Sequence, residues 1–233
     1  MRLIVEDALR GLIEDFQAGN FSVEAHPVSH RATKPEMRQT LISCLLSSGW
    51  KYEKAIDAAK LFVGKFPALD DAPPLDEVEA FLSDSRVRHR FPRSKAKQLH
   101  SSLSELANFP VDMIFQGSDI KGERIIRDIV QRRFPGLGYK QTSMFMRNVG
   151  AAKRLAVIDS HIVWYLRNCL SIESGNLTPK RYIFLEDMIN GVTESFNVDL
   201  NSFDVILWVL VREFKKRERT KLCGTQYVLP LAA

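Results

Sequence analysis

The sequence lacks the features that mark membrane-spanning, disulfide-bonded and low-complexity proteins. Its longest uninterrupted apolar run, Val205 to Val211, is much shorter than the about 20 residues that a helix needs to cross a bilayer. Its three cysteines, Cys44, Cys169 and Cys223, lie far apart and are odd in number, so they form neither a metal-ligand pair nor a disulfide framework. The 12 glycines and 10 prolines among 233 residues exclude a collagen-like chain. We therefore expect a cytoplasmic protein with no membrane partner.

The charges nearly balance over the whole chain, but they are distributed unevenly along it. Lysine and arginine number 33 against 28 acids, which gives a net charge of +5. The segments Arg86 to Lys97 and Ile129 to Ile158 each hold six cations and no acid, and Arg212 to Lys221 holds six cations and two acids. Clustered cations suit a polyanion such as nucleic acid, because each one that neutralises a phosphate releases counterions. A solvated surface is the alternative for any single cluster.

Apolar residues recur at spacings of three and four along most of the chain, which predicts an all-α protein. The N-terminal segment shows the pattern with Leu9, Leu12, Ile13 and Phe16. Acids every few residues make this segment an amphipathic helix rather than a secretion signal. Short breaks rich in proline, glycine and asparagine separate the periodic stretches and predict roughly ten helices.

The most specific pattern is FPGLGYKQTSMFMRNVGAAKRLAVIDSHI, from Phe134 to Ile162. Helices are predicted over Arg124 to Arg133 and over Lys140 to Val149, and the tight turn Pro135-Gly136-Leu137-Gly138 lies between them. Such a turn exposes backbone N–H groups at a helix N-terminus, where they can bind a phosphate without reading sequence. The pattern indicates a helix–hairpin–helix, although any glycine-rich turn between two helices would have the same sequence character.

Two polar residues near this turn have positions that suit catalysis. Lys140 lies in the first turn of the second predicted helix, where the positive end of the helix dipole favours the neutral, nucleophilic amine. Asp159 opens a further predicted helix and is the first acid after Asp128. Taken singly, a surface lysine and a helix N-cap are the alternative interpretations of these two residues.

Together, the string GLGYK…VIDSHI closely resembles the helix–hairpin–helix, Gly/Pro-rich and Asp motif of the base-excision DNA glycosylase superfamily. The resemblance implies that Lys140 and Asp159 are the catalytic pair. It also implies two helical lobes with a central cleft. Residues 33–149, with the hairpin at about 124–149, would form one lobe, and residues 1–32 with 150–221 the other. Residues 222–233 would form a C-terminal tail.

Three further motifs resemble those of the type 2 8-oxoguanine DNA glycosylases, namely RVRHRFPRSKAKQL, KQTSMFMRNVG and SFDVILW. The endonuclease III-type branch carries four closely spaced cysteines that bind an iron–sulfur cluster, whereas this chain has only Cys223 in that region. We therefore expect no iron–sulfur cluster and no catalytic metal. The resemblance leaves room for a monovalent cation at the hairpin carbonyls around Leu137.

The DNA-binding and base-binding residues follow from the same motifs. We expect DNA contacts from the hairpin, the basic segment and the helix after Asp159, at Gly136, Leu137, Gly138, Tyr139, Arg90, Arg93, Lys95 and His161. We expect the pocket for the extruded base to involve Trp208, Asp204, Phe145, Met144 and Trp50. Trp208 offers a face for stacking, and Trp50 would act as a wedge. The hydrophobic core is the alternative for every apolar member of this set, and a helix cap is the alternative for His161.

The resemblance implies a bifunctional DNA glycosylase/AP lyase that excises 8-oxoguanine from damaged double-stranded DNA. It would act as a monomer through a lysine Schiff base followed by β-elimination. The basic extension after Trp208 departs from the type 2 branch, in which the C-terminal residues help to recognise the base. Two alternatives therefore remain: a glycosylase for a different modified purine, and an inactive nucleic-acid-binding module of the same fold. The presence of both Lys140 and Asp159 favours an enzyme.

Overall fold

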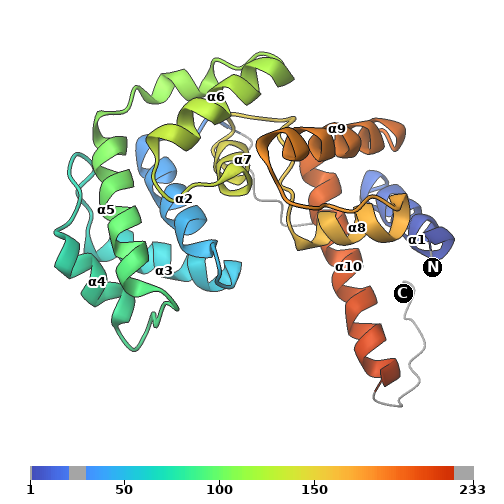
Figure 1. Ribbon diagram of the computed structural model, residues 1–233, viewed down its shortest axis with the longest axis horizontal. Coiled ribbons are helices and arrows are strands. Elements are labelled where there is room, and N and C mark those ends of the chain that lie inside the picture. Colours follow the sequence, from blue (N-terminus) through green and yellow to red (C-terminus); the bar gives the residue numbers. More distant parts are fainter. Residues whose placement is uncertain (1, 21–29, 223–233) are drawn as a thin grey trace. The chain divides into compact units, whose positions relative to one another are not determined.

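The computed structural model describes residues 2–20 and 30–222, with side chains over 5–20 and 30–216. Within those residues the chain forms ten α-helices and one 3-10 helix and no strand, which confirms the all-α prediction (Figure 1). The helices are α1 (Arg2–Gln17), α2 (Lys34–Ser47), α3 (Tyr52–Lys65), α4 (Leu75–Ser83), α5 (Pro92–Asn108), η1 (Val111–Phe115), α6 (Ile120–Arg133), α7 (Tyr139–Asn148), α8 (Ser160–Leu170), α9 (Pro179–Ser195) and α10 (Leu200–Leu222). None of the helices in this described part combines the length and apolar content that a membrane crossing needs.

The chain divides into two compact units, and each is described by itself below. One unit comprises Met1–Ala25 with Ile158–Ala233, and the other comprises His26–Val157. Both ends of the chain therefore belong to the same unit. The divisions fall at residues 25/26 and 157/158, whereas the sequence placed them at 32/33 and 149/150. As a result, Lys140 belongs to the second unit and Asp159 to the first.

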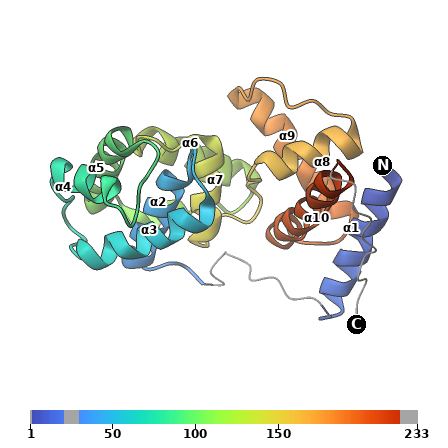
Figure 2. The ribbon, with the colours of Figure 1, turned by 90° about the horizontal axis from the view of Figure 1, so that it is seen from below.

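Unit 2 is built around α2, which packs against α3, α5 and α7 (Figure 2). Helix α2 begins after Thr33, whose backbone N–H donates to the Glu36 carboxylate at 2.7 Å and so satisfies one free group of the helix end. Its central residues, from Leu41 to Leu46, are almost completely buried. Apart from Ser43, whose hydroxyl donates to the Thr40 carbonyl oxygen at 2.8 Å, these residues are apolar around the whole helix, so this part of α2 can be buried on every side.

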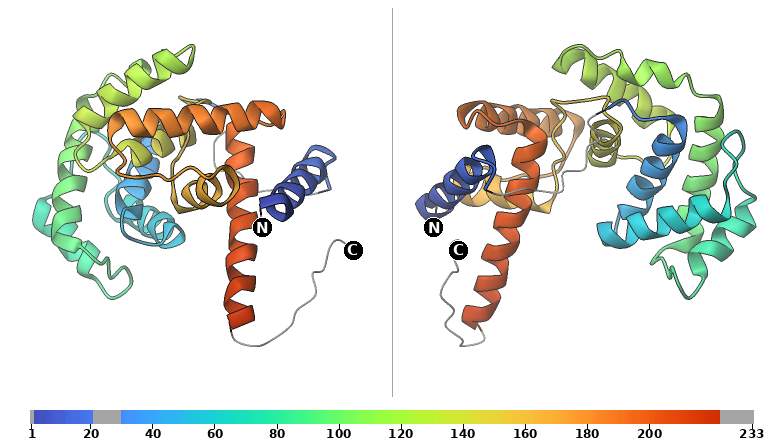
Figure 3. Two further views of the ribbon diagram at one scale, coloured as in Figure 1. Left: turned by 45° about the vertical axis from the view of Figure 1, so that its right-hand side comes forward. Right: turned by 180° about the vertical axis from the view of Figure 1, so that it is seen from behind.

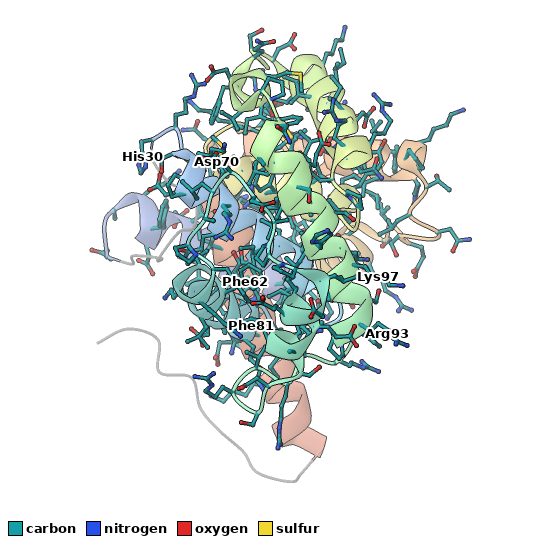
Figure 4. All side chains as sticks on the ribbon, turned by 90° about the vertical axis from the view of Figure 1, so that its left-hand side faces the viewer. His30, Phe62, Asp70, Phe81, Arg93 and Lys97 are labelled. Carbon is teal, nitrogen blue, oxygen red and sulfur yellow. The ribbon has the colours of Figure 1, made fainter. Side chains whose placement is uncertain are left out.

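A cluster of phenylalanines closes the core of unit 2 at the ends of α3 and α4. The rings of Phe62 and Phe81 meet edge to face with centroids 5.2 Å apart (Figure 4). Phe66 packs against Phe62 at 4.8 Å. Such aromatic pairs contribute about 0.5–1.5 kcal/mol beyond their buried area, so this cluster helps to fix α3 against α4.

Unit 1 contains α1, α8, α9 and α10, and α10 packs against the other three (Figure 3). The faces of α1 and α10 that bury Leu9, Ile13, Leu207 and Val211 are apolar at helical spacing. Helix α9 begins after its N-cap Thr178, whose hydroxyl oxygen accepts a hydrogen bond from the Arg181 backbone N–H. These contacts hold the N-terminus of α8, and with it Asp159, on a packed helical scaffold.

Candidate active site

The hairpin between α6 and α7 forms as the sequence predicted. Gly136 has a φ of +93°, a backbone conformation that favours glycine, and a Cβ on it would lie 2.5 Å from Cδ of Gln98, so that the end of this flexible side chain would have to move. Gly138 precedes α7, and its carbonyl accepts hydrogen bonds at 2.9 Å from the backbone N–H and the hydroxyl of Thr142. As at any helix N-terminus, the N–H groups in the first turn of α7 have no acceptor within the helix, because the carbonyls four residues earlier lie outside it.

The side chains of the hairpin turn inward and leave the backbone as the contact surface. Leu137 is only 4% exposed and belongs to the core of unit 2. The Tyr139 hydroxyl donates to Asp128 at 3.0 Å. The guanidinium of fully buried Arg127 lies 4.7 Å from the centre of the Tyr139 ring. The predicted DNA contact at Leu137 is therefore restricted to its backbone, because the side chain has no free surface.

Lys140 lies in the first turn of α7 and is half-buried. Its neighbour Cys44, on α2, is fully buried. Burial raises the pKa of the Cys44 thiol to about 12, while a hydrogen bond with Ser43 and the charge of Lys140 act in the opposite direction. The lysine is therefore close enough to act electrostatically on a buried thiol of α2, the helix that packs against α7, and it lies at the N-terminal end of α7.

Asp159 is the N-cap of α8, and both of its carboxylate oxygens are used. Oδ1 accepts hydrogen bonds from the backbone N–H groups of His161 and Ile162 at 2.7 and 3.0 Å. Oδ2 lies 2.7 Å from Nδ1 of His161, which must donate because a carboxylate only accepts. Burial raises the pKa of the Asp159 carboxyl, but the His161 ring and the two backbone amides outweigh it, so the pKa lies below its ordinary value. The N-cap interpretation is confirmed, and it is compatible with an ionised catalytic carboxylate.

Trp208 lies near this aspartate within unit 1. Its side chain belongs to α10 and is 37% exposed, so the ring is not a core residue. The His161 and Trp208 rings are tilted with centroids 6.2 Å apart. The Arg212 guanidinium lies 4.1 Å from the centre of the Trp208 ring. Asp204, one turn earlier on α10, is half-buried. Unit 1 therefore brings His161 and Trp208 together with Asp159, and it adds Arg212, which the sequence analysis did not select.

The remaining members of the predicted base pocket belong to unit 2 and pack inward. Phe145 is 1% exposed and packs in the core against Phe134, with ring centroids 6.4 Å apart, as the alternative interpretation of this residue expects. Met144 and Trp50 are partly buried and pack against the same core. The Trp50 ring meets His89 edge to face at 4.6 Å. The alternative of core packing therefore describes Phe145, and partly describes Met144 and Trp50.

The basic segment presents fewer cations to solvent than its sequence suggested. Arg90 and Arg93 are exposed, and Arg93 lies 3.8 Å from the Glu79 carboxylate. Lys95, a predicted DNA contact, is only 5% exposed and its ammonium donates to Gln98 at 2.9 Å, so its side chain faces the protein rather than solvent. Lys97 is exposed, one turn beyond Arg93 on the same face of α5 (Figure 4). Helical spacing identifies Lys97 directly, because residues four apart share a face and residues two apart do not.

A buried histidine holds the start of this basic segment. His89 is 5% exposed, and its Nε2 donates to the Leu46 carbonyl oxygen at 3.1 Å. Its Nδ1 accepts from the Phe91 backbone N–H at 3.0 Å, which fixes a single neutral tautomer. Burial is the main cause that lowers the pKa of His89 below its ordinary value. No motif marked this residue, because its role depends on contacts distant in the sequence.

A second buried residue without a sequence motif holds the segment that leads to Asp159. Glu123, in the first turn of α6, is 5% exposed. Its two carboxylate oxygens accept hydrogen bonds from the backbone N–H groups of Lys153 and Arg154 at 3.0 and 2.9 Å. Glu123 thereby fastens the chain between α7 and Val157 to the hairpin.

A hairpin with a lysine in its second helix, followed by an aspartate that caps the next helix, is typical of the helix–hairpin–helix DNA glycosylases. The profile of one family within this class, described as 8-oxoguanine DNA glycosylase, matches residues 22–198. The chain therefore belongs to the 8-oxoguanine DNA glycosylase family.

Curated proteins and solved structures agree with this membership. The 8-oxoguanine DNA glycosylase/AP lyase of Thermotoga petrophila is 28% identical over 190 residues, which cover 79% of this chain and 84% of that protein. The crystal structure of the Methanocaldococcus jannaschii 8-oxoguanine DNA glycosylase matches with a TM-score of 0.72 at 23% identity and covers 89% of this chain and 93% of its own. A complex of the M. jannaschii glycosylase/lyase with a 15mer DNA containing 8-oxoguanine matches with a TM-score of 0.63 at 24% identity, covering 88% and 89%. At these identities the two solved structures establish the fold.

Proposed function

We propose that this protein is a bifunctional 8-oxoguanine DNA glycosylase and AP lyase that acts on duplex DNA. The observation that carries the proposal is the position of Lys140 in the first turn of α7, directly after the hairpin turn. An ionised N-cap, Asp159, on the next helix completes the pair that the family motif requires. The activity named for the T. petrophila relative, which this chain matches over 84% of its length, supports the assignment.

The DNA-binding surface of unit 2 combines amides with exposed cations. The first-turn N–H groups of α7 suit a phosphate, because the helix dipole is positive there. Arg90, Arg93 and Lys97 add charge without reading sequence. A base within a duplex is out of reach of any side chain, so the enzyme extrudes the target nucleotide before chemistry begins. The M. jannaschii relative in complex with DNA containing 8-oxoguanine supports duplex DNA as the partner.

Lys140 is the nucleophile of the proposed reaction. The lone pair of its neutral Nζ attacks C1′ of the deoxyribose. The C1′–N9 bond then breaks, and its electrons leave with the purine, which takes up a proton. Opening of the sugar ring converts the adduct into a Schiff base. Loss of a proton from C2′ then expels the 3′ phosphate and cuts the strand. Amine, sugar and purine supply every group in these steps, so we propose that the reaction runs without a metal or redox cofactor.

Asp159 stabilises the charge that this reaction creates. Positive charge develops on the sugar as the purine leaves, and an ionised carboxylate with a lowered pKa supplies a fixed negative charge. The cap on α8 fixes the direction of the carboxylate, because Oδ1 is held by two backbone amides. Trp208, whose ring is exposed near His161, supplies the face on which the extruded purine stacks.

Borohydride trapping tests the proposal. Wild-type protein is incubated with a labelled duplex that carries 8-oxoguanine opposite cytosine, and reduction converts any Schiff base into a stable adduct. The adduct should disappear in Lys140→Gln. It should persist in Lys121→Gln, which removes an exposed lysine from the first turn of α6. An adduct that survives Lys140→Gln would disprove the role of this lysine, and its absence from the wild type would disprove the lyase activity on this substrate.

The extended α10 supports a second candidate, a glycosylase for a different modified purine. This helix continues from Trp208 to Leu222, whereas the type 2 branch that the sequence resembles ends shortly after the tryptophan. A panel of duplexes with different oxidised and alkylated purines distinguishes the two. Faster excision of another base than of 8-oxoguanine would favour this candidate.

A further inference from the structure

Within unit 1, a continuous series of contacts leads from Arg212 through Trp208 and His161 to Asp159. The Arg212 guanidinium lies over the Trp208 ring at 4.1 Å from its centre, the closest cation–ring approach on α10 among the described residues. The Trp208 ring adjoins the His161 ring, which donates to Asp159. Helices α8 and α10 pack directly against each other (Figure 3); Asp159 caps α8 and His161 lies in its first turn, while Trp208 and Arg212 belong to α10.

The guanidinium occupies a ring face that a stacked purine would need. Trp208 is 37% exposed, and Arg212 is exposed as well. A cation–π contact at such an exposed site contributes little free energy, so a stacked base can compete with the guanidinium for the indole face. Arginine also stacks on bases and donates to their edges in nucleic-acid complexes. In the free protein, Arg212 therefore occupies the face of Trp208 on which a purine would stack.

We propose that Arg212 is a specificity-determining residue, which covers Trp208 in the free protein and contacts the purine held on Trp208 in the complex. This inference rests on the proposed function. It gives the long α10 a role in choosing the substrate, since the residue lies one turn beyond the tryptophan.

The donor chemistry of arginine defines which purines Arg212 favours. A guanidinium offers five N–H donors and accepts nothing. 8-Oxoguanine presents carbonyl oxygens at C6 and C8, which accept, and an N–H at N7, which does not. 8-Oxoadenine carries an amino group at C6 in place of one of these carbonyls. Arg212 should therefore favour purines with a carbonyl at C6, and it should contribute nothing at an abasic site, where no base is present.

Single-turnover assays on three duplexes test this proposal. They contain 8-oxoguanine, 8-oxoadenine or a preformed abasic site, and excision and strand cutting are measured separately. Arg212→Leu should slow 8-oxoguanine excision by about tenfold to a hundredfold, the scale of one paired contact to a base. It should reduce the preference for 8-oxoguanine over 8-oxoadenine and change abasic-site cutting less than about twofold. Arg212→Lys keeps the charge without the planar fork and should restore little of the preference. Arg167→Leu, which removes an exposed arginine from α8, is the matched control.

The outcomes separate this inference from the proposed function. Equal losses on 8-oxoguanine and abasic duplexes would assign Arg212 to folding or to phosphate binding and overturn the inference. So would full restoration by Arg212→Lys, or an equal effect of Arg167→Leu. A wild type that excises 8-oxoguanine no faster than Arg212→Leu overturns the inference alone. A wild type that excises no purine overturns both.

Discussion

Replacement of Glu123 by glutamine should destabilise the protein strongly, although the change alters few atoms. The buried carboxylate accepts one backbone N–H on each oxygen, from Lys153 at 3.0 Å and from Arg154 at 2.9 Å. Glutamine keeps one oxygen acceptor and places an NH2 group against the other backbone N–H. Two donors then face each other in a site that is 5% exposed.

The size of the effect follows from these two hydrogen bonds. Hydrogen bonds to a charged group contribute about 1.5–3 kcal/mol, and a buried donor without an acceptor costs about 1–3 kcal/mol. Glu123→Gln weakens one bond and abolishes the other, so the expected loss is about 2–4 kcal/mol of unfolding free energy. In a protein of this length such a loss lowers Tm by roughly 5–15 °C. Glu194→Gln changes an exposed glutamate of α9 and should stay within about 0.5 kcal/mol.

Thermal unfolding and amide hydrogen exchange together check this reasoning. The Lys153 and Arg154 amides should lose protection in Glu123→Gln, while amides in the centre of α2 should keep theirs under conditions where the protein stays folded. Unchanged exchange at these two amides, with a Tm like that of Glu194→Gln, would show that the carboxylate does not hold this segment.

Two other changes test single groups. Asp159→Asn keeps an oxygen that can cap α8, so stability should change by less than about 1 kcal/mol, while 8-oxoguanine excision falls by about 10²- to 10⁴-fold. An equal loss of stability and activity in a urea titration would instead make the residue purely structural. His89 has a pKa lowered from 6.5, mainly by burial, so the folded state binds fewer protons than the unfolded state. Its contribution to stability is therefore complete above about pH 6.5 and is lost as the pH falls, because protonation breaks the bond that Nδ1 accepts from Phe91. A His89→Gln variant should show a flatter dependence of Tm on pH, and an unchanged slope would contradict this.

The features that the sequence predicted are those with a local cause. Helical spacing, the glycines of the turn at Gly136 and the cap at Asp159 each depend on residues within one or two turns, so the hairpin and the all-α class could be predicted. Counting charge along the chain does not separate buried Lys95 from exposed Lys97, because only the helix places them on different faces. The burial of Phe145 could not be predicted either, because an aromatic residue five positions after Lys140 has the same sequence character whether it faces a pocket or the core.

Two of the residues that the sequence did not reveal, Glu123 and His89, act over long separations. Glu123 reaches amides thirty positions away, and His89 reaches the carbonyl of Leu46. Neither partner is an ionisable side chain, so no complementary motif accompanies them. Arg212 lies within a basic run whose composition suggested phosphate binding, and only its place over Trp208 separates it from its neighbours. Hydrogen bonds to backbone groups, and contacts with the face of an aromatic ring, cannot be predicted from the sequence, because no residue type marks the partner.

The geometry at Asp159 also limits what this residue does in the reaction. A general base is most effective when its pKa lies near the working pH, and a carboxylate with a lowered pKa is a weak base. Both oxygens of Asp159 already accept hydrogen bonds, from two backbone amides and from His161. The same bonds that make it a poor proton acceptor keep it ionised and fixed in direction, which is what stabilisation of a cationic sugar requires. For the reaction proposed above, these bonds favour an electrostatic role for Asp159 over that of a general base.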